Sequence, residues 1–193
     1  MNEFRSITVT SCMKKIILIF MISNALASAE TCRDVVRDAS GRIVQTVESQ
    51  KNSNGSTKSV TRDASGRIVS TSSGAPSANG KMQTTYRDAS GRLIGSAATQ
   101  TTAGGASQTT YRDAAGRIEG SAASRPSTGS SSTTQFRDAS GRVTGSSTNR
   151  NGLTGTSTSV QRDASGRVVG TNTNRGQCHA TTVVPSPPPN VKR

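Results

Sequence analysis

The sequence predicts an all-β protein made of tandem β-hairpin repeats that form an antiparallel meander or a curved repeat sheet. The hexapeptide RDASGR recurs six times at a period of 25 residues, with Ala115 replacing serine in the fourth copy. A fixed period of this length is typical of an array of supersecondary units. β-Branched and aromatic residues flank each copy, as they do in the strands of hairpins. The first arginine of each copy is Arg37, Arg62, Arg87, Arg112, Arg137 and Arg162.

The composition leaves little material for a core. Of the 193 residues only 30% are hydrophobic and 3% aromatic, and there is no tryptophan. A compact globule usually draws on nearly half apolar residues. Low hydrophobicity combined with a net charge of +13 is close to the composition of disordered chains. The alternative to a hairpin array is therefore a largely disordered, low-complexity chain.

The first 29 residues are typical of an N-terminal extension plus a secretory signal peptide. Lys14 and Lys15 precede an apolar run over residues 16–22, and Ala27-Ser28-Ala29 follows as a cleavage site. The run is shorter than the about 20 apolar residues that span a bilayer, and the alternative is a short buried helix. We expect translation to start at Met13, cleavage after Ala29, and export to the periplasm or the extracellular space.

Each repeat contains two turns. In the first repeat, residues 38–41 suit a type I turn that ends in a left-handed glycine, because Asp38 can bond the backbone two residues on and Gly41 tolerates positive φ. This is a three-residue hairpin loop with a bulge. A second glycine turn lies between motifs, at Gly55, Gly80, Gly105 and Gly155, and at Gly129-Ser130 in the linker that slips. We therefore expect roughly twelve short antiparallel strands.

The predicted core is a single apolar ladder. A branched aliphatic follows the second arginine of every motif, and we expect these side chains to stack, assisted by Ala39 and its equivalents. An isolated hairpin is marginal in water, so the units must stack to be stable. The ladder consists of Ile43, Ile68, Leu93, Ile118, Val143 and Val168.

Two cysteines bracket the repeat domain, which we expect over residues 30–178. In an exported chain Cys32 and Cys178 are expected to form a disulfide, worth roughly 4–5 kcal/mol in the chain-entropy model. Such a bond ties the first repeat to the last and favours a closed or strongly curved sheet. The alternatives are lipidation of Cys32, although residues 29–31 make a poor lipobox, and a metal site with His179, whose spacing does not fit zinc. No metal or cofactor is expected. Residues 179–193 read as a proline-rich, disordered tail.

The motif resembles a known bacterial repeat. Residues 88–93, Asp-Ala-Ser-Gly-Arg-Leu, resemble the YD repeats of Rhs-type bacterial secreted proteins. The tyrosine that directly precedes aspartate in that family is arginine here, with Tyr86 and Tyr111 displaced by one residue. The chain is also too short for the family's large shell and has no toxin domain. The resemblance implies β-hairpin strips and an exported bacterial protein, and implies no ligand.

The paired arginines admit two interpretations. In the first, they are solvated strand ends whose stems cover apolar neighbours. In the second, two like charges lie close across the hairpin, Asp38 relieves only one of them, and a bound anion relieves the other. Neighbouring motifs would stand about 10 Å apart, which suits a repetitive polyanion. The candidates are Arg37, Arg42, Arg62, Arg67, Arg87, Arg92, Arg112, Arg117, Arg137, Arg142, Arg162 and Arg167.

These observations favour a binding or interaction module over an enzyme. The expected partner is an acidic polysaccharide, lipopolysaccharide or another surface protein, and the alternative is a structural spacer or disordered secreted chain without a dedicated ligand. Nucleic acid is disfavoured by the signal peptide and the scarcity of aromatics for base stacking. One histidine and no acidic cluster leave no catalytic constellation. The strands, rich in serine and threonine, lead us to expect no membrane span in the mature chain.

Overall fold

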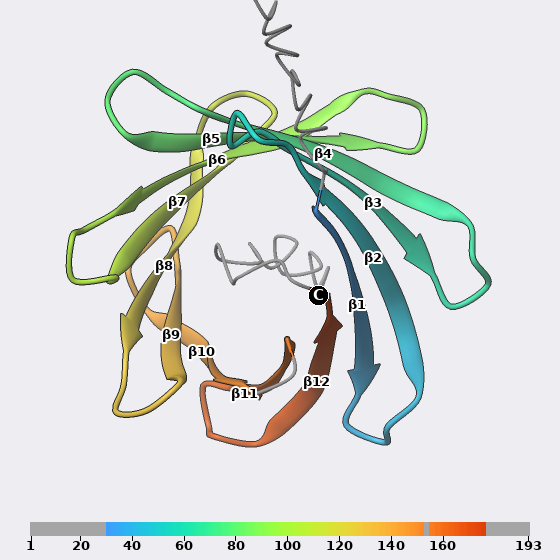
Figure 1. Ribbon diagram of the computed structural model, residues 1–193, viewed down its shortest axis with the longest axis vertical. Coiled ribbons are helices and arrows are strands. Elements are labelled where there is room, and N and C mark those ends of the chain that lie inside the picture. Colours follow the sequence, from blue (N-terminus) through green and yellow to red (C-terminus); the bar gives the residue numbers. More distant parts are fainter. Residues whose placement is uncertain (1–29, 153–154, 177–193) are drawn as a thin grey trace, which may run out of the picture.

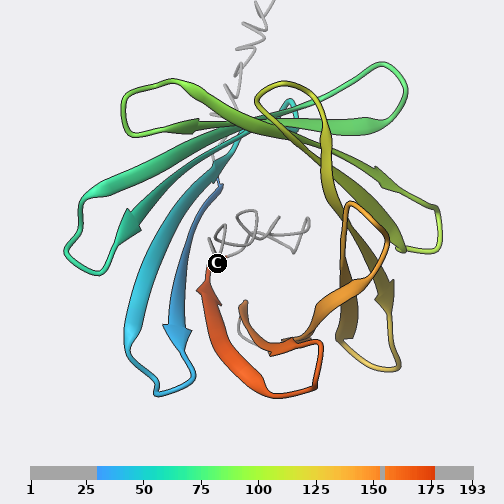
Figure 2. The ribbon, with the colours of Figure 1, turned by 180° about the vertical axis from the view of Figure 1, so that it is seen from behind.

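The computed structural model describes residues 30–152 and 155–176, which form twelve antiparallel strands closed into one β-barrel (Figure 1). Every strand pairs with its neighbours in sequence, and β1 pairs with β12 to complete the ring, which Figure 2 shows from behind. The strands are β1 (Glu30–Asp38), β2 (Ile43–Lys51), β3 (Thr57–Asp63), β4 (Ile68–Pro76), β5 (Lys81–Asp88), β6 (Leu93–Thr101), β7 (Ser107–Asp113), β8 (Ile118–Pro126), β9 (Ser131–Asp138), β10 (Val143–Asn151), β11 (Thr156–Asp163) and β12 (Val168–Arg175).

The predicted meander of about twelve antiparallel strands is confirmed. The sequence left a closed and a strongly curved sheet open, and the structure shows a closed barrel. The predicted signal peptide with its start at Met13, Cys178, His179 and the proline-rich tail all lie outside the described residues. No helix within the described part of the chain is long and apolar enough to cross a membrane.

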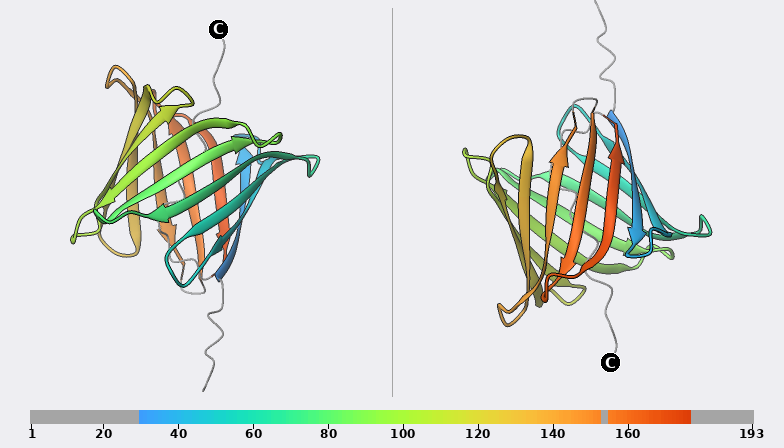
Figure 3. Two further views of the ribbon diagram at one scale, coloured as in Figure 1. Left: turned by 90° about the horizontal axis from the view of Figure 1, so that it is seen from above. Right: turned by 90° about the horizontal axis from the view of Figure 1, so that it is seen from below.

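The motif turns have the predicted geometry. In the β1–β2 turn, Gly41 N donates to Asp38 O (3.0 Å), Asp38 N donates to Arg42 O (2.9 Å), and Gly41 has φ +81°. The same two hydrogen bonds recur in all six motifs. Because a meander reverses direction at each turn, the six motif turns lie at one end of the barrel and the linker turns at the other. We call the end with the motif turns the motif rim. The side views of Figure 3 show the inclined strands with turns at both ends.

Buried and exposed side chains alternate along the strands, most regularly on β5 to β8. Side chains on the concave inner face converge, whereas those on the outer face diverge, so the buried set lies inside. Tyr86, Ala97, Tyr111 and Ala122 form the buried apolar cluster, with the partly buried Phe136 packed against it. Alanine alternates with the aromatic rings because register pairs Ala97 with Tyr111 and Ala122 with Phe136.

Much of the remaining inner face is hydroxylic. Thr99 and Thr109 are buried and share a hydrogen bond of 2.8 Å between their hydroxyls. Ser49 and Ser59 form a similar pair at 2.9 Å on β2 and β3. These two pairings across strands satisfy hydroxyls that would be costly to bury alone.

The predicted apolar ladder is wrong as a core. All six of its members are 38–50% exposed, and Ala39 and its equivalents are exposed as well. The reason is the bulge that follows each motif turn: the register slips by one residue, for example between Val36 and Arg37 on β1. The aliphatic residue after the second arginine pairs only within its own hairpin, as Ile43 does with Arg37. The adjacent hairpin first pairs two residues further on, at Gln45 opposite Asp63, so this residue lies uncovered at the motif rim.

Glycines allow close strand contact just below this bulge. A Cβ at Gly120 would lie 2.4 Å from Arg137 O, and one at Gly145 would lie 2.4 Å from Arg162 O. Such approaches exclude any larger residue unless the backbone moves. Glycine next to a bulge is a known means of bending a sheet toward closure, and Gly95 and Gly170 repeat the arrangement at 2.6 Å.

Buried polar side chains form hydrogen bonds across the seam between β1 and β12. Asn172 Nδ2 and Asn174 Nδ2 donate to Asp34 Oδ1 at 3.0 and 3.1 Å. Burial raises the pKa of Asp34, while the hydrogen bonds from Asn174 and Asn172 act in the opposite direction. Cys32 is buried nearby, and a Cβ built at Gly176 would stand 3.4 Å from its Sγ. Cys178 follows two residues after Gly176 but lies outside the described residues, so the disulfide stays a prediction.

Candidate functional site

The first arginine of every motif braces its own turn. Arg37 Nη1 donates to Gly41 O at 2.9 Å, and the equivalent bonds in the other five motifs measure 2.7–3.1 Å. In the fifth motif Arg137 Nη2 also donates to Gln135 Oε1 at 2.7 Å. These guanidinium groups thus support the loop from which the rest of the motif projects.

The side chain of the motif aspartate accepts hydrogen bonds from backbone amides of its own turn. Asp38 Oδ1 accepts hydrogen bonds from the amides of Ser40 and Arg42, both at 2.9 Å, and the other five copies repeat the pair. The carboxylate therefore closes the loop through peptide N–H groups. Its hydrogen-bonding oxygen is directed at the loop interior, and the structure shows why aspartate fits this position.

In two motifs a serine hydroxyl strengthens this loop. Ser140 Oγ donates to Asp138 Oδ1 and Ser165 Oγ donates to Asp163 Oδ1, each at 2.7 Å. These hydroxyl bonds are the main reason that the pKa of Asp138 and of Asp163 is lowered, with smaller lowering from the loop amides and from the adjacent arginine. The carboxylates remain ionised well into the acid range.

The second arginine of each motif is the free cation of the turn. Arg42 is exposed, and its backbone amide is held by Asp38. Among the described residues, no hydrogen bond or ion pair holds the guanidinium of Arg42 or of its five equivalents. The two arginines of a motif, identical in the sequence, thus have different roles in the fold. The free guanidinium groups belong to Arg42, Arg67, Arg92, Arg117, Arg142 and Arg167.

Together these six side chains form a ring of cations, which we call the guanidinium ring. Each motif contributes two arginines and one aspartate, a net positive charge of one per hairpin. Successive motif turns are two strands apart in the closed barrel, which is about 10 Å measured across the strands. The sequence prediction of regularly spaced arginines therefore corresponds to a closed circle at the motif rim.

A set of exposed hydrophobic side chains lies beside this ring. Ten large hydrophobic side chains of the described residues are exposed, and all of them occupy the two positions after a second arginine. Six of them form the ladder that the sequence predicts as a core, and the four at the second position belong to no predicted core or site. The ten are Ile43, Val44, Ile68, Val69, Leu93, Ile94, Ile118, Val143, Val168 and Val169.

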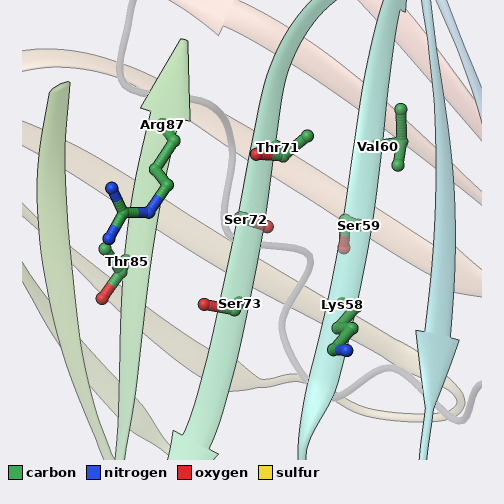
Figure 4. A pocket seen from close by; sticks show the side chains of 8 residues that line it. All are labelled: Lys58, Ser59, Val60, Thr71, Ser72, Ser73, Thr85 and Arg87. Atoms are coloured by element: carbon green, nitrogen blue, oxygen red, sulfur yellow. The ribbon is translucent and has the colours of Figure 1, made fainter. Parts of the chain in front are cut away.

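Two shallow hollows lie on the strands. One of about 250 Å³ spans β3, β4 and β5, with Lys58 and Val60 on one side and Arg87 on the other (Figure 4). Another of about 450 Å³, between β10 and β11, includes Arg150, Arg162 and Val160. Both are open and lined by cations and small polar groups. Within residues 30–152 and 155–176, no three His, Cys, Asp or Glu side chains gather as metal ligands.

No protein-family model and no curated protein matches the chain.

Proposed function

We propose that this protein is an exported binding module that holds an acidic surface polymer, such as lipopolysaccharide or an acidic polysaccharide, through the guanidinium ring. The observation that carries the proposal is that six identical exposed guanidinium groups make no hydrogen bond or close ion pair among the described residues. Export itself rests on the signal-peptide pattern of residues 1–29. The proposed activity is binding, with no catalytic role.

The chemistry of the ring fits a polyanion. Guanidinium groups bind phosphate, sulfate and carboxylate through paired hydrogen bonds. The loop that presents Arg42 is held by Asp38 and by Arg37, so little backbone ordering is left to occur on binding. Repetition multiplies weak contacts, because each bound segment raises the effective concentration of the next. A polymer with regularly spaced charges can engage several hairpins at once.

The division of labour between the two arginines defines the test. Arg37 and its equivalents are positioning residues, whereas Arg42 and its equivalents contact the ligand. Replacing the first arginines would disturb the turns and confound any loss of binding. The informative ring variant instead changes the second arginine to glutamine in all six motifs, as Arg42→Gln, Arg67→Gln, Arg92→Gln, Arg117→Gln, Arg142→Gln and Arg167→Gln.

The matched control removes the same charge elsewhere. Six exposed cations outside the motifs are changed to glutamine instead, namely Arg33, Lys58, Lys81, Arg125, Arg150 and Arg175. Exposed ion pairs contribute about 0.2–1 kcal/mol each, so loss of the ring should weaken heparin and lipopolysaccharide binding by at least about tenfold. The control should lose much less, and wild-type affinity should fall steeply with added salt.

The proposal is contradicted if both variants lose affinity equally, because net charge rather than placement would then govern binding. Salt-independent affinity would contradict it as well. Circular dichroism of both variants checks that the sheet is intact. If the folded wild type binds neither polyanion, the spacer without a dedicated ligand becomes the better account of the chain.

A further inference from the structure

The motif rim combines its cations with an exposed apolar surface. Every exposed large hydrophobic residue of the described chain, 38–50% accessible, follows a second arginine by one or two positions. Apolar clusters on a protein surface mark sites of interaction. A soluble acidic polysaccharide would use the guanidinium ring and leave these aliphatic side chains in water, so a polysaccharide by itself does not explain them.

The exposed aliphatics are denser on four consecutive hairpins of the ring than on the other two. Because β12 pairs with β1, the hairpins β11–β12, β1–β2, β3–β4 and β5–β6 are consecutive around the barrel. Each of them carries two exposed aliphatics, whereas the remaining two hairpins carry one each, followed by Glu119 and Thr144. We call the eight clustered side chains the aliphatic arc: Val168, Val169, Ile43, Val44, Ile68, Val69, Leu93 and Ile94.

We infer that the aliphatic arc docks the barrel on the surface of a bilayer that contains anionic phospholipids, with the arc in the interface and the neighbouring guanidinium groups on lipid phosphates. The inference rests on the proposed function, since the same ring supplies the phosphate contacts. Peripheral proteins bind membranes through this sum of buried apolar area and attraction to anionic lipids. A surface of anionic phospholipids offers phosphate and hydrocarbon together, which a soluble polysaccharide such as heparin does not.

Length scales agree with this placement. The arginine and its two aliphatics are one and two positions apart, about 3–7 Å along the strand. Each headgroup layer of a bilayer is about 5–8 Å deep. Arginine can also extend its stem across apolar surface while keeping its charge at the phosphates. The ring and the arc therefore fit within one interfacial layer.

Charge disfavours a second copy of the chain as the occupant. Two barrels joined rim to rim would bring two guanidinium rings together, each motif having a net positive charge of one, and like charges across an interface are repulsive. A surface of phosphates is complementary to the ring. Self-association thus becomes an outcome that the experiment must detect.

The arc variant changes the second aliphatic of each arc hairpin to threonine: Val44→Thr, Val69→Thr, Ile94→Thr and Val169→Thr. Threonine is already present at the equivalent Thr144, so these changes suit the hairpin. The control variant carries Val35→Thr, Val60→Thr and Val160→Thr, where Thr85 and Thr110 are the natural equivalents. Circular dichroism checks both folds. Binding of the full chain to phosphatidylcholine vesicles with and without phosphatidylglycerol is measured by sedimentation, and heparin affinity is measured in parallel.

The arc variant is expected to lose at least about tenfold in partitioning to anionic vesicles and to keep its heparin affinity, while the control keeps both. The ring variant should lose both. At high salt, wild-type heparin binding should vanish while some vesicle binding persists, because burial of apolar area is not screened. This last comparison needs no variant.

If the arc variant binds anionic vesicles as strongly as the wild type does, the inference is wrong and the proposed function still stands. A wild type that binds neither heparin nor vesicles overturns both. If the arc changes alter the oligomeric state in analytical ultracentrifugation and leave vesicle binding unchanged, the arc is a self-association surface and the inference is wrong.

Discussion

Replacing Asp34 by alanine removes the acceptor that joins the two ends of the barrel. Asp34 is 1% exposed, and its Oδ1 receives the side-chain amides of Asn172 and Asn174 at 3.0 and 3.1 Å. A hydrogen bond to a charged group contributes about 1.5–3 kcal/mol, so the two bonds together represent about 3–6 kcal/mol. Removing the carboxylate also removes its burial cost, which is the reason for its raised pKa. We expect a net loss of about 2–4 kcal/mol.

Thermal and urea unfolding, followed by circular dichroism, measure this loss. For a chain of this size each kcal/mol shifts the Tm by about 2–4 °C, so Asp34→Ala should melt about 5–15 °C below wild type. Asp34→Thr should lose less, because its hydroxyl can accept one of the two amides. Threonine occupies the equivalent Thr84 and Thr109. Glu119→Ala, at an exposed site away from the seam, is the control for loss of an acidic residue.

The pH dependence provides a second readout at the same site. A carboxyl whose pKa is raised by folding binds protons more tightly in the folded state, so lowering the pH through the raised pKa stabilises the fold. Asp34→Thr should abolish this component. The seam argument would be refuted if Asp34→Ala had the same Tm as the wild type, or if it were more stable than Asp34→Thr.

Three further predictions concern other parts of the barrel. Gly120→Ala places a Cβ 2.4 Å from Arg137 O and should lower the free energy of unfolding, measured in urea, by about 1–3 kcal/mol. In the control Gly104→Ala the new Cβ meets nothing within 4 Å, and stability should change by less than about 0.5 kcal/mol. Equal effects of the two changes would contradict the argument from close strand approach. Tyr111→Phe should be neutral or stabilising by up to about 1 kcal/mol in the same assay, because the Tyr111 hydroxyl is buried without a partner among the described residues; a clear loss of stability would reveal a partner. The pKa of Asp138, followed by NMR, should lie below the ordinary value of 3.8. The ionised carboxylate stabilises its turn fully above the unfolded pKa, and this stabilisation should be lost as the pH falls through the folded pKa. A midpoint at or above 3.8 would show that the Ser140 hydrogen bond does not form in solution.

The architecture was predictable wherever its cause is local. Asp38 and Gly41 act within five residues of chain, and the same local hydrogen bonds recur at every period. The sequence alone therefore predicts the hairpins, the antiparallel meander and the repeated presentation of arginines. It also identifies the guanidinium groups as candidates, although it cannot separate Arg37 from Arg42, since that distinction depends on which guanidinium reaches the Gly41 carbonyl.

The sequence by itself determined the turns, the strand number and the charge of each motif, because those follow from residues close together in the chain. Only the tertiary structure decided what is inside. Closure joins Asp34 to Asn174 across 140 residues and makes a concave face that small, hydroxylic and aromatic side chains fill. The bulge beyond each turn leaves Ile43 and Val44 at the rim, 43% and 44% exposed. Hydrophobicity predicts burial only where the fold brings another surface against the residue, and at the motif rim it does not.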